Sequence, residues 1–265
     1  MKIPHEWHRS FFKNSFYNPA SPAAVARAPE EVRFVLRKTK LKKGGKLLDL
    51  CCGPARHSLL LARKGLDVTG YDYSADYLKE AAAKAQKAKV RLTLLRGDMR
   101  RLKFSGEFDA VINLFTSFGY FQKFSDDIKT LKGAARALKP GGLFMIDIVH
   151  GDFVRKNFRP RNWMRLEDGS YRLEAARLTN DGVQNTWTTI KNGKVLEKSF
   201  FTRLYSKNRL TAAMRKAGLT PLKFWGAFNG AKLTGKTNRL IALARKAKKQ
   251  SLVNPKIIIP ANNHG

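Results

Sequence analysis

Two acidic residues and a small-residue turn stand at the spacing that a nucleoside-binding site requires. An apolar run contains Asp49, and Cys51 and Gly53 then form a tight turn that leads into a helical pattern. Asp72 follows Gly53 by 19 residues, at the end of a second apolar run. In a strand–turn–helix–strand unit, a carboxylate at this distance binds ribose hydroxyls. The pairing therefore predicts a cofactor that contains a nucleoside.

Two further polar residues follow later apolar runs. Asp98 comes after the third such run and Asn113 ends the fourth. In an open parallel sheet the carboxyl ends of the strands meet at one edge, where ligands bind. We therefore expect one ligand to contact all four strand ends. Gly53 would permit close backbone approach, and Asp98 could accept a hydrogen bond from an exocyclic amine.

The elements that must position these residues alternate between strand and helix patterns. Strands are predicted at 46–51, 67–71, 90–96, 108–114, 143–149, 219–227 and 239–244, and helices at 23–39, 58–64, 74–87, 126–138 and 206–217. Such alternation is typical of a parallel sheet with helices on both faces. We predict an α/β fold with a doubly wound, mostly parallel seven-stranded sheet.

A different pattern interrupts this alternation. Strand-like runs at 171–178, 184–190 and 195–205 are separated by turns that contain Asn-Asp-Gly and Lys-Asn-Gly. Turns of this composition join antiparallel strands, so they predict a small antiparallel β lobe inserted into the sheet domain. The expected organisation is an N-terminal arm at 1–34, a cofactor domain at 35–150 and 206–246, the lobe at 151–205, and a basic tail at 247–265 with a short strand at 257–259.

Basic residues dominate the composition, with 52 Lys and Arg against 20 Asp and Glu and a net charge of +32. This excess favours association with nucleic acid, anionic lipid surfaces or an anionic substrate. The basic residues are spread along almost the whole chain, which favours a generally basic surface over a dedicated nucleic-acid site. A nucleic-acid partner is the second interpretation.

The composition also limits the class of protein. A chain of 265 residues suits one catalytic-size domain with an inserted lobe. No apolar run approaches the roughly 20 residues of a membrane span, and the N-terminus lacks a signal-peptide core, so we expect a cytoplasmic protein. Cys51 and Cys52 are the only cysteines and are adjacent, which predicts reduced packing residues and no metal site.

Five segments of the chain carry a resemblance to a known family. They are LDLCCG at 48–53, VTGYDYS at 68–74, GDMR at 97–100, FDAVIN at 108–113 and LKPGG at 138–142. Their order resembles that of the class I S-adenosylmethionine-dependent methyltransferases, strongly over 35–150 and more weakly over 205–245. The segments NLFTSFGYF at 113–121 and RHS at 56–58 are similar to one bacterial branch of that family.

The resemblance implies S-adenosylmethionine as the cofactor and S-adenosylhomocysteine as its product. The implied contacts are Asp49, Cys51, Gly53 and Arg56 at the methionine part, Asp72 and Tyr73 at the ribose, Asp98 and Met99 at the adenine, and Asn113 and Leu114 toward the substrate. The chain departs from the family in its three-glycine loop, because Cys51 and Ala55 replace the outer glycines. We expect the Ala55 methyl group to force φ below zero or to narrow the loop.

Several of these residues also have a structural interpretation. Asp49 could brace the loop, and Asp98 could form a turn. Arg56 and His57 could be surface residues at the start of a helix, or they could reach a carboxylate of the cofactor or substrate. Asp109 stands at a strand start remote from the ligand edge, so we expect it to be structural.

Methyl transfer from a sulfonium needs no protein nucleophile, so positioning can supply most of the rate. A general base is required only for a poorly ionised hydroxyl or a protonated amine. The candidates for catalytic roles are Tyr17, His57, Tyr120 and His150, and the two tyrosines could instead line the acceptor pocket. No one of them is singled out by the sequence.

The expected acceptor is a nitrogen or oxygen of a small molecule or peptide. Residues 113–116 lack the proline-and-aromatic motif similar to that of exocyclic-amine nucleic-acid methyltransferases. The arm and the lobe are expected to wall the acceptor pocket. Trp163, Trp187 and Trp225 could line it or could instead form the core of the lobe. The alternatives are an RNA methyltransferase and a non-enzymatic RNA-binding protein; a dinucleotide oxidoreductase is disfavoured by the glycine spacing.

Overall fold

The central element of the fold is a seven-stranded sheet in a computed structural model that describes residues 3–4, 6–12 and 16–247. Its strands are β1 (Lys46–Leu50), β2 (Asp67–Asp72), β3 (Thr93–Arg96), β4 (Phe108–Asn113), β5 (Leu138–Val149), β10 (Leu219–Trp225) and β11 (Arg239–Lys246). Their order is β10-β11-β5-β4-β1-β2-β3. β1 to β5 pair in parallel, whereas β11 is antiparallel to both neighbours. The predicted mostly parallel seven-stranded sheet is confirmed.

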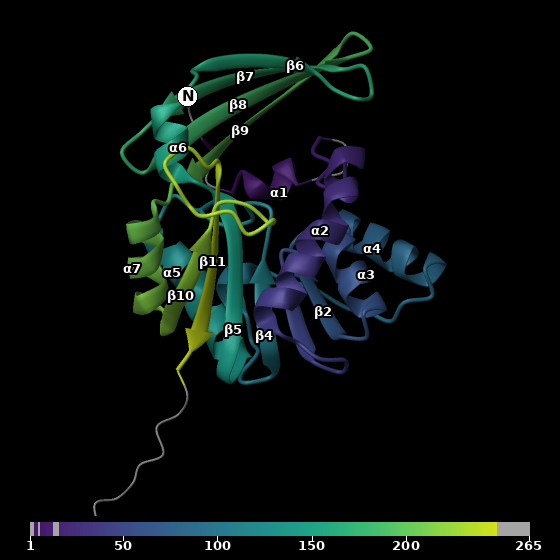
Figure 1. Cartoon of the computed structure of the whole chain (residues 1–265). Helices are drawn as coiled ribbons and strands as arrows, with labels where there is room; N and C mark the ends of the chain where they lie inside the picture. Colours follow the sequence, from purple (N-terminus) through teal and green to yellow (C-terminus); the bar gives the residue numbers. More distant parts are fainter. Residues whose placement is uncertain (1–2, 5, 13–15, 248–265) are drawn as a thin grey trace, which may run out of the picture.

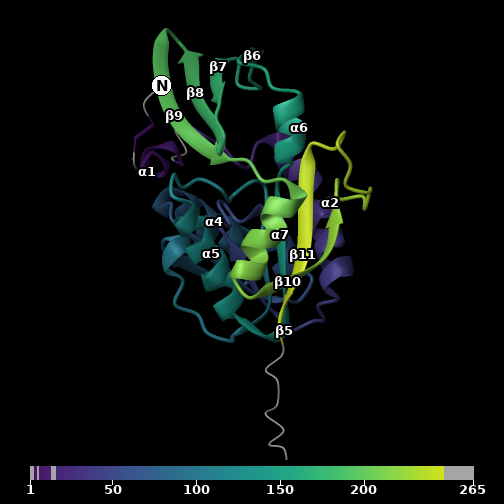
Figure 2. The same cartoon turned by 90° about the vertical axis from the view of Figure 1, so that its left-hand side faces the viewer.

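Helices cover both faces of this sheet, as the alternation of patterns predicted. They are α2 (Pro22–Thr39), α3 (Arg56–Arg63), α4 (Ala75–Lys87), α5 (Phe124–Ala137) and α7 (Lys207–Lys216), with a 3-10 turn η1 (Met99–Arg101). Figure 2 shows α5 and α7 on one side of the sheet and α2 on the other. Adjacent residues of β1 point to opposite faces, so Leu47 packs in the α2 and α3 cluster and Leu48 in the α5 and α7 cluster.

The chain between β5 and α7 forms a second, four-stranded antiparallel sheet. Its strands are β6 (Arg161–Arg165), β7 (Tyr171–Leu178), β8 (Gly182–Lys191) and β9 (Lys194–Arg203), in sequence order across the sheet. In Figure 1 this lobe lies above the sheet domain, with α1 (His8–Phe11) beneath β9. The predicted inserted lobe is confirmed. β6 and the short helix α6 (Gly151–Lys156) were not predicted, because neither segment has a regular apolar pattern.

Two strands of the seven-stranded sheet begin at residues other than those predicted. β3 begins at Thr93 rather than at residue 90. β5 begins at Leu138 rather than at residue 143 and includes the Pro140-Gly141-Gly142 segment. Gly141 has a φ of 80° there, and the pairing of β4 with β5 shifts its register between Phe108 and Ala110. The predicted strand at 257–259 lies outside the described residues.

Candidate functional site

The turn after β1 holds three residues in the left-handed backbone region. Cys51, Gly53 and Ala55 have φ values of 63°, 55° and 61°. The expectation that Ala55 would force φ below zero is wrong, because this residue takes the conformation that a glycine would take. A left-handed backbone costs a residue with a Cβ roughly 1–2 kcal/mol. The loop keeps this shape because Ala55 is fully buried and its N–H donates to Cys52 O at 3.1 Å.

Asp72 fixes this turn from the end of β2. Its Oδ2 accepts from Gly53 N at 2.8 Å, and its Oδ1 accepts from Ser74 N at 2.8 Å. Burial raises the pKa of the Asp72 carboxyl to about 6, although the backbone N–H groups oppose that rise. Each carboxylate oxygen can accept a further hydrogen bond. Asp72 can therefore hold the loop and a pair of ligand hydroxyls together.

A cavity with about 760 Å³ of space, partly open to solvent, lies at this edge of the sheet. Six of the ten predicted cofactor residues line it: Cys51, Gly53, Asp72, Tyr73, Asp98 and Met99. Two of the catalytic candidates, Tyr17 and Tyr120, also line it, whereas His57 and His150 do not. We call this space the first cavity. Of the four strand-end residues expected to meet at one ligand, Gly53, Asp72 and Asp98 line this cavity and Asn113 does not.

Gly97 is a residue of this cavity that the sequence reasoning did not single out. A Cβ at Gly97 would lie 1.9 Å from the Tyr71 hydroxyl, so a larger residue would displace that ring. Tyr71 lines the cavity and its hydroxyl donates to Asp98 O at 3.3 Å. The Gly97-Asp98 pair after β3 was the available signal, since a glycine at a strand end often marks a close approach.

Asp98 is held by a neighbour on its own turn. The Arg100 Nε lies 3.0 Å from Asp98 Oδ1 and 2.9 Å from Oδ2, and the Arg100 N–H donates to Oδ1 at 2.9 Å. Burial alone would raise the pKa of Asp98, but the bonds from Arg100 outweigh it and hold that pKa below its ordinary value. Asp98 is therefore an ionised acceptor at the cavity wall, oriented by Arg100.

Four predicted cofactor residues lie behind the lining rather than in it: Asp49, Arg56, Asn113 and Leu114. Asp49 accepts from Ser58 Oγ at 2.6 Å and is 2% exposed, which is a bracing role. Glu31 Oε2 of α2 lies 3.1 Å from Arg56 Nη1 and 2.6 Å from His57 Nε2, where α3 packs against α2. The expectation that Arg56 and His57 could be surface residues is wrong, because this buried carboxylate holds both.

Two buried polar atoms next to the cavity have no hydrogen-bond partner among the described residues. They are Nη2 of Arg56 and Oδ1 of Asn113. The Arg56 guanidinium carbon lies 4.4 Å from the centre of the Phe115 ring, which lines the cavity. Asn113 is 1% exposed and donates from Nδ2 to Leu50 O at 3.0 Å. A buried donor and a buried acceptor without partners are costly, so both can take part in binding a ligand.

A second cavity, with about 1240 Å³ of space, lies between the sheet domain and the lobe. It shares the aromatic residues Phe12, Tyr17, Phe115 and Tyr120 with the first cavity. Other aromatic walls come from the arm, from the segment after β5 and from the lobe: Trp7, Phe11, Phe153, Phe158, Trp187 and Phe200. The two cavities therefore adjoin across an aromatic partition.

The three tryptophans expected at the acceptor pocket have different positions. Trp187 lines the second cavity. Trp163 is 67% exposed and lines neither cavity, and Trp225 is 4% exposed and packs against Phe34 with ring centres 5.1 Å apart. The predictions for Trp163 and Trp225 are therefore wrong. Trp163 pairs with Leu173, whereas Trp187 pairs with Glu174, which places these tryptophans on opposite faces of the lobe.

The arm closes over both cavities through specific contacts. Trp7 Nε1 donates to Tyr120 O at 3.2 Å, and its ring packs on Tyr120 and on Phe200 of β9. Tyr77 of α4 donates to Tyr17 O at 2.6 Å. Burial raises the pKa of Tyr17 and, more strongly, that of Tyr120. Both hydroxyls are thus neutral near pH 7 and act as walls or hydrogen-bond groups there.

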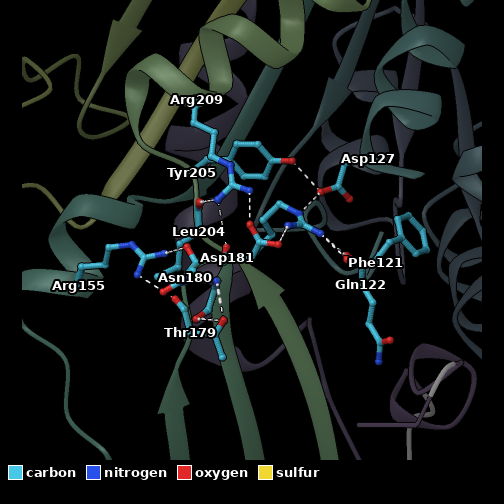
Figure 3. A network of polar contacts seen from close by, with 12 residues as sticks. Phe121, Gln122, Asp127, Arg155, Thr179, Asn180, Asp181, Leu204, Tyr205 and Arg209 are labelled. Carbon is cyan, nitrogen blue, oxygen red and sulfur yellow. Dashed lines mark hydrogen bonds and ion pairs between the residues drawn. The ribbon is translucent and has the colours of Figure 1, made fainter. Parts of the chain in front are cut away.

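The base of the lobe is joined to the first cavity by a buried network that the sequence reasoning missed (Figure 3). Arg203, at the end of β9, donates from Nη2 to Phe121 O at 3.0 Å and to Gln122 O at 2.7 Å. Its Nε donates to Asp127 Oδ2 at 2.9 Å, and Tyr205 donates to the same oxygen at 2.7 Å. Phe121 lines the first cavity, so the lobe holds one of its walls.

Among the described residues, no group of three or more His, Cys, Asp or Glu could hold a metal ion. No helix in the described part of the chain is long and apolar enough to cross a membrane. Cys51 and Cys52 are both free, and burial raises the pKa of each thiol well above its ordinary value.

Comparison with known proteins shows the family to which this chain belongs. A family model described as a methyltransferase domain matches residues 47–142. The Synechocystis methyltransferase sll0829 is 33% identical over 220 residues, which cover 77% of this chain and 92% of that protein. The chain belongs to the S-adenosylmethionine-dependent methyltransferases. The fold and the enzyme class expected from the sequence are therefore confirmed.

Other relatives of this methyltransferase match over less of their length. The Bacillus subtilis methyltransferase YqeM is 39% identical over 130 residues, so the match spans about half of each protein, 49% of this chain and 52% of YqeM. A Streptomyces venezuelae enzyme named dTDP-3-amino-3,4,6-trideoxy-alpha-D-glucopyranose N,N-dimethyltransferase is 29% identical over 112 residues, 42% of this chain and 46% of that enzyme.

Solved structures share the fold at low sequence identity. The methyltransferase CcbJ of Streptomyces caelestis has a TM-score of 0.75 at 19% identity, covering 88% of this chain and 100% of that one. The sugar N-methyltransferase KedS8 of Streptoalloteichus has a TM-score of 0.65 at 19% identity, covering 94% and 96%. These similarities concern the fold alone.

Proposed function

We propose that this methyltransferase transfers the methyl group of S-adenosylmethionine to a nitrogen or oxygen of a small-molecule or peptide acceptor. The observation that carries the proposal is the pair of adjoining cavities with the shared wall of Phe12, Tyr17, Phe115 and Tyr120. The first cavity is lined by the strand-end residues of a nucleoside site, and none of these residues lines the second cavity. A cofactor in the first cavity and an acceptor in the second would therefore lie next to each other, and such proximity supplies much of the rate of a methyl transfer.

The residues of the first cavity fit the cofactor. Asp72 retains acceptor capacity on both oxygens for the ribose hydroxyls, and Asp98 and Met99 can hold the adenine. The unpartnered Nη2 of Arg56 suits the carboxylate of the methionine part, and the unpartnered Oδ1 of Asn113 suits its ammonium group. We assign Asp49 to bracing of the loop beneath Cys51 and Gly53. When bound, the cofactor supplies an electrophilic methyl group.

The chain's own residues act by positioning rather than by proton transfer. The His57 Nε2 lies 2.6 Å from Glu31 Oε2, and the His150 Nδ1 lies 3.0 Å from Thr237 O. Neither histidine lines the first or the second cavity. The raised pKa values of Tyr17 and Tyr120 make their phenolate forms scarce near pH 7. An acceptor atom that is nucleophilic without losing a proton, such as the nitrogen of a neutral amine, suits this site better than the oxygen of an unactivated alcohol.

The relatives support a small-molecule acceptor. The Streptomyces venezuelae relative is named for dimethylation of an amino sugar nucleotide, and KedS8 is named a sugar N-methyltransferase. The arm and the lobe supply most of the second cavity, as expected of elements outside the cofactor fold. We propose that residues 1–34 and 151–205 serve as the acceptor-binding parts of the chain.

An RNA acceptor is the second candidate, favoured by the net charge of +32. The test is a titration of RNA at several salt concentrations beside a titration of S-adenosylhomocysteine. The proposal predicts saturable binding of S-adenosylhomocysteine, and RNA affinity that falls steeply with salt and shows no preference for sequence. Sequence-preferring RNA binding would favour RNA as the acceptor. Absence of saturable S-adenosylhomocysteine binding would contradict the proposed function.

A further inference from the structure

The second cavity carries one carboxylate and one guanidinium among its described lining residues, Glu174 and Arg159. The rest of the lining is aromatic, aliphatic or neutral polar. In a chain with 52 basic and 20 acidic residues, an acidic side chain in an aromatic cavity is the exception. Its position therefore bears on what the cavity binds.

Glu174 lies on the face of the lobe that looks toward the cofactor domain. It stands directly opposite Trp187 in the pairing of β7 with β8. The Trp187 ring centre lies 4.9 Å from that of Phe200 and 6.1 Å from that of Tyr17. Tyr17 belongs to both cavities. An aromatic surface thus runs from Glu174 to the wall of the first cavity.

The Glu174 carboxylate has spare hydrogen-bonding capacity. Its Oε2 accepts a long hydrogen bond from Asn162 Nδ2, at 3.5 Å. Arg172 lies on the same face of β7, with its guanidinium carbon 4.4 Å from the Trp187 ring centre. Its charge interacts with that of Glu174, but no hydrogen-bonded ion pair joins the two in the described part of the chain. A half-buried carboxylate without a hydrogen-bonded cationic partner favours a cationic ligand.

The aromatic surroundings favour the same ligand. The faces of Trp, Tyr and Phe rings attract cations, and they also provide apolar contact for the body of a ligand. We infer that Glu174 binds a protonated amine of the acceptor that is not the methylated atom, so that the substrate is a small amine with an aromatic or aliphatic body and a separate nucleophilic nitrogen or oxygen. This inference rests on the proposed function and adds a cationic group to its nitrogen-or-oxygen acceptor.

The test measures binding without turnover, on the full chain saturated with S-adenosylhomocysteine. The probes are phenethylamine, cyclohexylamine, phenethyl alcohol and phenylacetate. Calorimetry and tryptophan fluorescence measure the binding of each probe. Glu174→Gln removes the charge and keeps the shape. Glu197→Gln is the matched control, because Glu197 pairs with Thr188 on the opposite face of the same lobe and accepts from Thr188 Oγ1 at 3.1 Å.

We expect the wild type to bind at least one of the amines and to bind the alcohol and phenylacetate more weakly. Glu174→Gln should weaken amine binding at least tenfold and leave S-adenosylhomocysteine affinity unchanged, and Glu197→Gln should change neither. The inference is overturned if neither amine binds, if Glu174→Gln binds amines as the wild type does, or if phenylacetate binds best. Failure to bind S-adenosylhomocysteine would instead overturn the proposed function.

Discussion

Arg203 donates to Asp127 at 2.9 Å, and neither side chain has any exposed surface. Arg203 ends the last strand of the lobe, and Asp127 belongs to α5 of the sheet domain. The Nη2 of Arg203 donates to Phe121 O and Gln122 O in the loop that walls the first cavity. The ion pair therefore couples the position of the lobe to the shape of the cofactor site.

Arg203→Met should destabilise the protein and weaken cofactor binding together. Removing one partner of a buried ion pair leaves the other charge uncompensated and costs about 3–5 kcal/mol. Two carbonyl acceptors also lose their donor. Urea unfolding measures the first effect, and calorimetric titration with S-adenosylhomocysteine in the absence of urea measures the second.

Arg177→Met is the control for that experiment. Arg177 lies on the lobe and bonds to the Gln184 side chain at an exposed position, so its removal should change stability by no more than about 0.5 kcal/mol. Equal unfolding free energies for the Arg203 and Arg177 variants would contradict the role assigned to the buried pair.

Ala55→Gly should cost less stability than a glycine placed in the following helix. Ala55 has a φ of 61°, so glycine relieves backbone strain of about 1–2 kcal/mol there. Ala62 lies within α3, where glycine costs about 1 kcal/mol. Both variants lose one methyl group, so thermal unfolding of the pair isolates the backbone effect. A cost for Ala55→Gly as large as that for Ala62→Gly would show that the turn is not strained.

Affinity for S-adenosylhomocysteine should decrease as the pH falls through about 6. Burial raises the pKa of Asp72 to about 6, so the free protein protonates this carboxyl below that pH. A protonated carboxyl loses acceptor capacity for the ribose hydroxyls, and its ionised fraction falls about tenfold for each further pH unit. Dissociation constants measured from pH 5 to pH 8 test this. Asp72→Asn should bind weakly and without this pH dependence, whereas a flat wild-type profile would argue against Asp72 as the ribose ligand.

The fold and part of the lining of the first cavity could be predicted because they follow from local patterns. Apolar runs mark the strands, and the carboxyl ends of parallel strands bring Gly53, Asp72 and Asp98 to one cavity. Arg203 and Asp127 are 76 residues apart, and nothing in the sequence pairs them. The sequence does not show that Trp187 faces the second cavity and Trp163 faces away from it, because the face on which a side chain lies depends on how the strands pair.

One of the two outcomes expected for Ala55, a φ below zero, is wrong for a related reason. The residue type predicts a negative φ, but the loop is over-determined by Asp72, which accepts from Gly53 N, and by the buried position of the Ala55 side chain. Tertiary contacts therefore impose the backbone that glycines would adopt freely.

The central claim is that the first cavity binds S-adenosylmethionine through Asp72. The most direct test is calorimetric titration of S-adenosylhomocysteine into the wild type, Asp72→Ala and Asp109→Ala. Asp109 is the matched control, since it accepts from Lys46 N at 2.8 Å and pairs with Lys139 away from the cavity. We predict saturable wild-type binding, at least tenfold weaker binding by folded Asp72→Ala, and unchanged affinity for Asp109→Ala. No saturable binding by the wild type, or equal affinity for the wild type and Asp72→Ala, would contradict the claim.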